Sequence, residues 1–402
     1  MRDLAESFVV EMDPASIMAA AERQTGLADW GPMDFVERLT VLCEAVDADT
    51  GLHASGRASI YLDCIRYCSN RLRIQHVLTA HPEIHDEVID RPVIVAGLPR
   101  SGTTHLLNLM AADRRFRSIP YWESREPVPD PSEPSTVTGE DPRYTRCREA
   151  WEQTDVLMPL LKAMHAMTPD HIHEELELMC PDFASYNFEW LFDAPAWRDH
   201  YLAHDQTPHY AYMRTALKLL QWQDRQRGIE PKRWVLKCPQ HMEQLPVLMA
   251  TFPDATVALP HRDPTSVIAS AVTMLSYGDR MRRKSTDPRY FAAYWSDRIE
   301  QILRACTRDR DVVPAEQSID VLFHEFMADD VAMVERIYAV AGIDMTDEAR
   351  ADLSAYMDAN PRGVHGRVGY DMAVDFGIDR DQLRSRFSDY MARFGVQPEG
   401  EQ

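Results

Sequence analysis

A short apolar run followed by a glycine-containing loop is the feature that most restricts how this chain folds. Residues 93–95 read Val-Ile-Val, and such a run is typical of a strand buried on both faces. The loop 97–104 (GLPRSGTT) follows, and residues 104–112 carry apolar side chains at helical spacing. A strand, a tight loop and a helix in this order predict a parallel sheet whose ligands bind where the strands end.

The composition of this loop suits a phosphate group. Gly97 and Gly102 let the backbone approach a ligand closely. The first turn of the following helix offers free N–H groups and a partial positive charge. The loop also holds a fixed cation and several hydroxyl donors. The residues predicted to bind phosphate are Arg100, Ser101, Gly102, Thr103 and Thr104.

The loop departs at one position from the nucleotide-binding pattern GxxxxGK[ST]. In that pattern the lysine reaches the outer phosphates and the next hydroxyl holds magnesium, whereas Thr103 stands here in place of the lysine. A phosphosulfate donor used without a metal fits this loop. Two alternatives stay open: a P-loop-type nucleotide kinase or phosphotransferase, and a non-catalytic nucleotide-binding protein.

Alternating strands and helices continue beyond the loop. Strands are expected at 234–236, 255–259 and 318–323, and helices at 144–167, 197–227, 244–252, 264–275 and 331–341. Residues 1 to about 88 instead read as helices only. The predicted fold class is α/β, a P-loop-like parallel sheet flanked by helices with a helical N-terminal extension. The boundaries are 1–88 for the cap and 89–402 for the α/β part, or one continuous domain.

Charge and composition limit the partners. The 402 residues carry a net charge of −21, which disfavours nucleic acid and anionic membranes. A nucleotide therefore needs a local cluster of cations. The sequence contains no apolar run of the ~20 residues that would span a bilayer. Its N-terminus lacks the pattern of a signal peptide, and its seven cysteines are scattered. A cytoplasmic location is expected, and a homo-oligomer stays open.

Three segments between about 90 and 395 resemble sulfotransferases that use 3′-phosphoadenosine-5′-phosphosulfate (PAPS), in the bacterial, actinobacterial-type branch with a long helical N-terminal region. The loop 97–104 is similar to the 5′-phosphosulfate loop of that family. Arg262 and Ser270, eight residues apart, match its 3′-phosphate site. The segment 360–367, with Arg362, Gly363 and Arg367, is similar to a basic, glycine-containing segment that closes over the 3′-phosphate.

The resemblance implies sulfuryl transfer from PAPS to a hydroxyl or amine, which needs a base for the acceptor proton and positive charge at the leaving oxygen. Many family members carry Lys-Thr-His where this chain has 237–241 (KCPQH), so the histidine is displaced by two residues. His241 is predicted as the base and Lys237 as the charge stabiliser. Glu174 or Glu175 is the competing base.

Two further expectations concern metals and the acceptor. His171 and His173 lie beside these glutamates, but no third ligand is evident and the pattern is not HExxH, so no metal is expected. The aromatic-rich stretch 183–197 is expected to be mostly core. Part of it is predicted to line a pocket for a hydrophobic small-molecule or lipid-like acceptor.

Overall fold

The computed structural model describes residues 10–130, 132–133, 139–361, 363–364, 366 and 368–400. At its centre is a five-stranded sheet in the order β2-β3-β1-β4-β5, and every strand pairing is parallel. The strands are β1 (Val93–Val95), β2 (Phe116–Arg117), β3 (Arg233–Lys237), β4 (Thr256–His261) and β5 (Ser318–Leu322). The predicted α/β class is confirmed.

Strand β1 lies in the middle of the sheet. Val95 is in register with Lys237 of β3 on one side and Ala258 of β4 on the other. Because parallel strands end at the same edge, the chain segments that follow β1, β3 and β4 leave the sheet side by side. This arrangement brings together the loop 97–104, the segment 237–241 and the segment 262–270.

Helices cover both faces of the sheet, and the side chains of β1 divide between two apolar cores. Val93 and Val95 pack with α5 and α17, whereas Ile94 packs with α12, α13, α14 and α15. The covering helices are α5 (Thr103–Ala111), α12 (Thr207–Gln226), α13 (Leu245–Thr251), α14 (Pro264–Asp279), α15 (Pro288–Asp309), α17 (Asp330–Val340) and α18 (Asp347–Ala359). All residues of β1 are fully buried, as its β-branched composition predicts.

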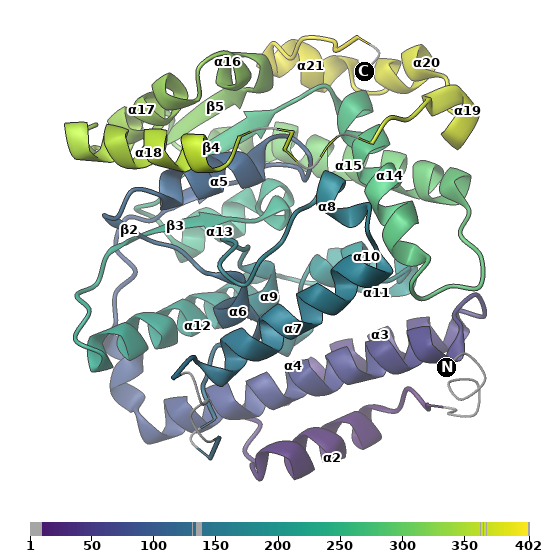
Figure 1. The fold of residues 1–402 in the computed structure, drawn as a ribbon, viewed down its shortest axis with the longest axis vertical. Coiled ribbons are helices and arrows are strands. Elements are labelled where there is room, and N and C mark those ends of the chain that lie inside the picture. Colours follow the sequence, from purple (N-terminus) through teal and green to yellow (C-terminus); the bar gives the residue numbers. More distant parts are fainter. Residues whose placement is uncertain are drawn as a thin grey trace.

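The first helices of the chain lie together at one end of the molecule, at the bottom of Figure 1. They are α2 (Pro14–Thr25), α3 (Phe35–Ala48) and α4 (Ala54–Ala80), followed by the 3-10 turn Pro82–Asp86. The Asp13 side chain caps α2 by accepting from the N–H of Ser16, and Gly26 ends it in the left-handed conformation. The helical character predicted for this region is confirmed.

One buried carboxylate joins these helices to the rest of the chain. Asp182 accepts from Arg38 of α3 and Arg71 of α4, at 2.9 Å each, and His209 of α12 lies 2.6 Å from its other oxygen. Burial alone would raise the pKa of Asp182, but the hydrogen bond with His209 and the charge of Arg38 hold it below its usual value. The carboxylate is therefore ionised and fully partnered.

The remaining short helices surround these layers. They are α6 (Tyr121–Arg125), α7 (Pro142–Leu157), α8 (Leu161–Met164), α9 (Leu176–Met179), α10 (Asn187–Leu191), α11 (Pro195–Ala203), α16 (Phe323–Ala328), α19 (Met372–Phe376), α20 (Arg380–Ser385) and α21 (Ser388–Phe394). The helix expected over 144–167 is interrupted after Leu157, because Met158 precedes Pro159 and leaves the helical region. Within the described residues, no helix is both long and apolar enough to cross a bilayer.

Candidate active site

The loop after β1 is held tightly against the sheet. A Cβ atom on Gly97 would lie 2.6 Å from the Thr103 side chain and 3.0 Å from Pro260 at the end of β4, so only glycine fits. Gly102 has a φ of 84°, and Arg100 has a φ of 68°. A non-glycine residue in this region is strained, and such strain is characteristic of functional loops.

The N-terminus of α5 is open to an anion. Gly102 precedes it without any side-chain cap, so backbone N–H groups of the first turn are available at the positive end of the helix dipole. The hydroxyls of Ser101 and Thr103 instead donate to the Leu98 carbonyl, at 2.6 and 3.4 Å. The backbone of this loop, more than those two hydroxyls, is therefore free to hold a phosphate.

Two arginines and a serine join the loop to the end of β4. Arg100 donates through Nε to Ser270 Oγ at 2.9 Å, and Arg262 donates through Nη1 to the Arg100 carbonyl at 2.7 Å. Burial, and then the charge of Arg262, lower the pKa of Arg100. Arg100 donates to two uncharged groups, the Ser270 hydroxyl and the Met164 carbonyl. This part of the site has positive charge available for an anionic ligand.

The C-terminal part of the chain closes one side of this cluster. Glu399 binds Arg262 in a bidentate ion pair with both distances at 2.7 Å, and Arg384 pairs with Asp263 at 3.0 Å. Tyr370 lies close enough for the charge of Arg262 to lower its pKa, although burial raises that pKa overall. The sequence did not predict Glu399, Arg384 or Tyr370 as part of the site, because each lies more than a hundred positions from Arg262 in the chain.

The late basic segment is only partly described. Arg362, His365 and Arg367 lie outside the described residues. Gly363 has a φ of 74° with no atom within 4 Å of a would-be Cβ, so it occupies an open turn.

At the end of β3, Lys237 and Glu174 form an ion pair. Lys237 is only 1% exposed, while Glu174 retains 16% of its side-chain exposure. Burial, and to a smaller extent the charge of Arg100, lower the pKa of Lys237 to about 7 from its ordinary value of 10.5. The ammonium of Lys237 and the carboxylate of Glu174 thus stand together next to the phosphate loop.

His241 and Glu175 lie deeper, and both are completely buried. His241 Nδ1 contacts the Tyr210 hydroxyl at 2.9 Å, and its Nε2 lies 3.5 Å from Glu175. The other oxygen of Glu175 accepts the backbone N–H of Lys237 at 2.9 Å. Both ring nitrogens of His241 therefore face protein groups. Glu175 fixes the backbone of the strand end that carries Lys237.

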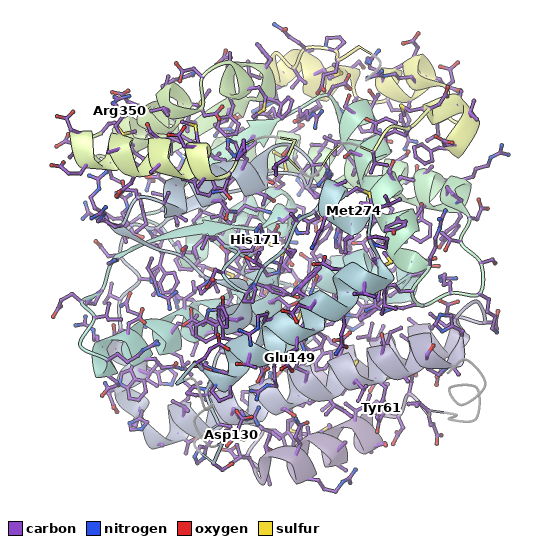
Figure 2. All side chains as sticks on the ribbon, viewed as in Figure 1. Tyr61, Asp130, Glu149, His171, Met274 and Arg350 are labelled. Carbon is purple, nitrogen blue, oxygen red and sulfur yellow. The ribbon has the colours of Figure 1, made fainter. Side chains whose placement is uncertain are left out.

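A group of neutral histidines borders Lys237. The rings of His165 and His171 lie 5.5 Å apart, and those of His171 and His173 lie 6.5 Å apart. Burial lowers the pKa of His171 to about 4 and the pKa values of His165 and His173 well below their usual range. His171 appears near the middle of the molecule in Figure 2. These uncharged rings can exchange hydrogen bonds with a ligand without adding charge.

The family model of the sulfotransferase family matches residues 92–347, a segment that contains the loop, the Lys237–Glu174 pair and the Arg262–Ser270 pair. The chain belongs to the sulfotransferase family. No curated protein sequence gives a significant match. Among solved structures, sulfotransferase STF1 from Mycobacterium tuberculosis H37Rv is similar, at 28% identity and a TM-score of 0.80, over 93% of this chain and 98% of that one.

Sulfotransferase STF9 from Mycobacterium avium is also similar in fold, with a TM-score of 0.83 at 23% identity, over 98% of this chain and 100% of that one. At 98% coverage of this chain, the match to STF9 takes in the helical N-terminal region. The bacterial sulfotransferase family predicted from the three segments is confirmed.

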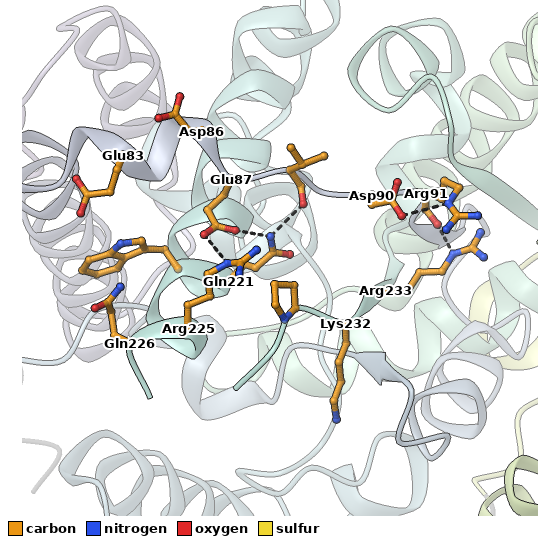
Figure 3. Close-up of a pocket in the computed structure, with 13 residues that line it drawn as sticks. Glu83, Asp86, Glu87, Asp90, Arg91, Gln221, Arg225, Gln226, Lys232 and Arg233 are labelled. Carbon is orange, nitrogen blue, oxygen red and sulfur yellow. Dashed lines mark hydrogen bonds and ion pairs between the residues drawn. The ribbon is translucent and has the colours of Figure 1, made fainter. Parts of the chain in front are cut away.

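A large cavity of this sulfotransferase lies away from the loop. It has a volume of about 790 Å³ and lies by the amino ends of the strands, where Arg91 and Arg233 sit at the starts of β1 and β3 (Figure 3). Glu87 there accepts from Gln221 at 2.6 Å and pairs with Arg225 at 2.8 Å. Since ligands of open parallel sheets bind at the opposite edge, the family activity points to the loop and not to this cavity.

The charge state of Lys237 can be tested through the stability of the sulfotransferase. Between pH 7 and 10.5 the unfolded chain binds a proton that the folded chain does not, so this lysine makes the unfolding free energy rise with pH. We expect the Lys237→Met/Glu174→Gln double variant to lack this rise, a difference on the order of 2 kcal/mol between pH 7 and 9.5. Urea denaturation at both pH values measures it.

The exposed Lys232 supplies the control for that measurement. Lys232→Met is expected to follow the wild-type dependence on pH, because the Lys232 side chain is in contact with water in both the folded and the unfolded chain. Parallel curves for the wild type and the double variant would contradict the lowered pKa of Lys237.

Proposed function

We propose that this sulfotransferase transfers a sulfuryl group from PAPS to a hydroxyl, or an amine, of a hydrophobic small-molecule or lipid-like acceptor. The observation that carries the proposal is the direct contact of Arg100 with Ser270 and of Arg262 with the Arg100 carbonyl. It joins the loop suited to a 5′-phosphosulfate with the strand end suited to a 3′-phosphate. A nucleotide that carries phosphates on the 3′ and 5′ positions of one ribose requires this closeness.

In this proposal the donor is held without a metal. The N–H groups of the α5 terminus, Arg100 and Thr104 bind the phosphosulfate end. Arg262 and Ser270 bind the 3′-phosphate, joined by Arg362 and Gly363 of the late segment. Because Glu399 forms an ion pair with Arg262, donor binding at Arg262 would exchange one anion on that guanidinium for another.

Lys237 is proposed to stabilise the negative charge that develops on the bridging oxygen as the sulfuryl group leaves. The donor's own negative charge raises the pKa of a nearby ammonium, so Lys237 is protonated once the donor binds. A buried cation aimed at developing charge is among the strongest sources of catalysis.

Glu174 is our proposed base for the acceptor proton. Its carboxylate keeps some exposure and lies against Lys237, whereas His241 is enclosed by Tyr210 and Glu175. A base must come within hydrogen-bond reach of the acceptor, and exposure favours Glu174. His241 and Glu175 then act as positioning residues that hold the end of β3.

Exposed apolar side chains near the site support the proposal of a hydrophobic acceptor. Val156, Leu157 and Leu160 are 81%, 68% and 53% exposed. This apolar segment leads into α8, whose Met164 carbonyl accepts from Arg100 at 2.7 Å. Exposed apolar surface beside a polar site favours a ligand with a large apolar part. The free, buried cysteines are consistent with our proposal of a cytoplasmic location.

Binding of 3′,5′-adenosine bisphosphate tests the donor. We expect it to raise the unfolding temperature strongly, and Arg262→Ala to weaken its affinity by about 1.5–3 kcal/mol, as for a charge-assisted contact. Calorimetric titration measures the affinity. Arg336→Ala is the control, because Arg336 is exposed and pairs only with Glu325 among the described residues.

Transfer of label from ³⁵S-PAPS to an acceptor library then tests the activity. Absence of any bisphosphate effect at millimolar concentration would contradict the proposed donor. Binding without transfer to any acceptor would favour a non-catalytic nucleotide-binding protein, and magnesium-dependent ATP turnover would favour a phosphotransferase.

A further inference from the structure

His200 of α11, His204 just after the end of that helix and Glu37 of α3 form a compact ligand set. One nitrogen each of His200 and His204 and one oxygen of Glu37 lie within 4.8 Å of one another. We propose that these residues bind a divalent transition-metal ion, with zinc as the best fit. Nothing in this proposal depends on the donor or the acceptor of the sulfuryl transfer.

The two histidine rings lie side by side at the end of α11. His200 is in the last turn of the helix and His204 directly follows it with an extended backbone, and their ring centroids lie 4.0 Å apart. His204 Nδ1 donates to the His200 carbonyl at 2.7 Å, because a carbonyl can only accept. That hydrogen bond fixes the tautomer and leaves the Nε2 lone pair of the neutral ring free. Backbone carbonyls commonly orient metal-binding histidines in this way.

Glu37 completes the set from another helix. Its Oε1 lies 3.2 Å from His200 Nε2, and its side chain is 70% exposed. The carboxylate can therefore turn toward an ion placed between the rings. Two imidazole nitrogens and one carboxylate oxygen, with a fourth position left for water, suit the tetrahedral preference of zinc. Calcium and magnesium prefer oxygen ligands throughout.

The cavity and the charges around the three ligands favour the binding of a hydrated cation. The ligands line a cavity of about 240 Å³ that also contains Asp34 and Asp205. The only arginine in its lining, Arg38, is already paired with Asp34 and Asp182. Carboxylates outside the ligand set thus add negative potential, and the nearby guanidinium is neutralised.

A second compact group, Asp34, Asp182 and His209, does not carry the same inference. Asp182 there already binds the guanidinium groups of Arg38 and Arg71. Those charges repel a metal ion, whereas the Glu37 cluster has no cation among its ligands. The zinc ion would instead tie α11 to α3, at a surface where these helices already pack together.

Zinc binding to the full-length, metal-free protein tests the proposal. We expect one saturable equivalent in competition with a chromophoric chelator, since the cysteines are buried and do not compete. We expect His204→Gln and Glu37→Gln each to weaken the affinity by on the order of tenfold or more. His76→Gln changes an exposed histidine of α4 and is expected to bind zinc as the wild type does.

Cobalt(II) supplies an independent readout. Its visible spectrum in the wild type is expected to show the intense bands of a four-coordinate ion, and His200→Asn is expected to lose them while keeping its circular dichroism. Wild-type zinc affinity in both His204→Gln and Glu37→Gln, or only unsaturable binding to the wild type, would overturn the site. A failure of bisphosphate binding would bear on the proposed donor alone.

Discussion

Glu174→Gln is expected to lower the turnover number for sulfuryl transfer by about 10²–10⁴-fold, the usual contribution of a positioned general base. Glutamine keeps the size of the side chain and can still contact Lys237, but it cannot accept the acceptor's proton. The affinity for adenosine bisphosphate should change little, because Glu174 does not touch the cations of the loop in our proposal. Steady-state rates with labelled PAPS, beside calorimetric titration, separate the two effects.

Asp170→Asn is the matched control for this experiment. Asp170 is an exposed carboxylate four residues earlier, and it accepts from Tyr144 at 2.8 Å. Its variant should keep wild-type turnover. If Glu174→Gln also keeps wild-type turnover while a folded His241→Asn variant loses it, the base is His241, as first predicted from the sequence.

Lys237→Met is expected to lower turnover by about 10²–10³-fold, as removal of one group that stabilises transition-state charge does elsewhere. Methionine fills a similar volume, so the buried end of β3 should keep its packing. The loss should appear mainly in the turnover number, because the charge matters most while the bridging oxygen becomes negative. Single-turnover rates at saturating donor measure it directly.

The Lys237→Arg variant separates the effect of the charge from the effect of the side chain's shape. A guanidinium keeps the charge but is larger than the fully enclosed space around Lys237, so partial recovery of turnover would support an electrostatic role. Equal turnover in Lys237→Met and the wild type would show that the charge at this position is not used in the reaction.

Local patterns were sufficient to predict the central architecture. The Val-Ile-Val run, the glycine-containing loop and the alternation after residue 230 each reflect short-range rules, and the parallel sheet follows from them. The two-residue strand β2 and the long helix α15 were missed. β2 is too short to show a period. The start of α15 carries the same Asp-Pro signal as α2, at Asp287 and Pro288, so this helix could have been predicted.

Long-range contacts explain what the sequence could not predict of the candidate site. Arg262 and Ser270 were predicted from the resemblance to the 3′-phosphate site of the family, in which the two residues have the same eight-residue spacing. The enclosure of His241 depends on Tyr210 and Glu175, and the occupation of Arg262 depends on Glu399. Neither the periodicity of apolar residues nor a sequence motif predicts such contacts between residues that are distant in the chain.

The Asp182 carboxylate has a consequence for how the chain can move. Two guanidinium groups and one imidazole from three different helices converge on it, all of them shielded from water. Moving α3 and α4 outward would leave these charges buried without a partner, and each broken ion pair would cost several kcal/mol of free energy. The helices α3 and α4 are therefore held in place against α12. Any movement that admits a bulky ligand has to occur in another part of the molecule.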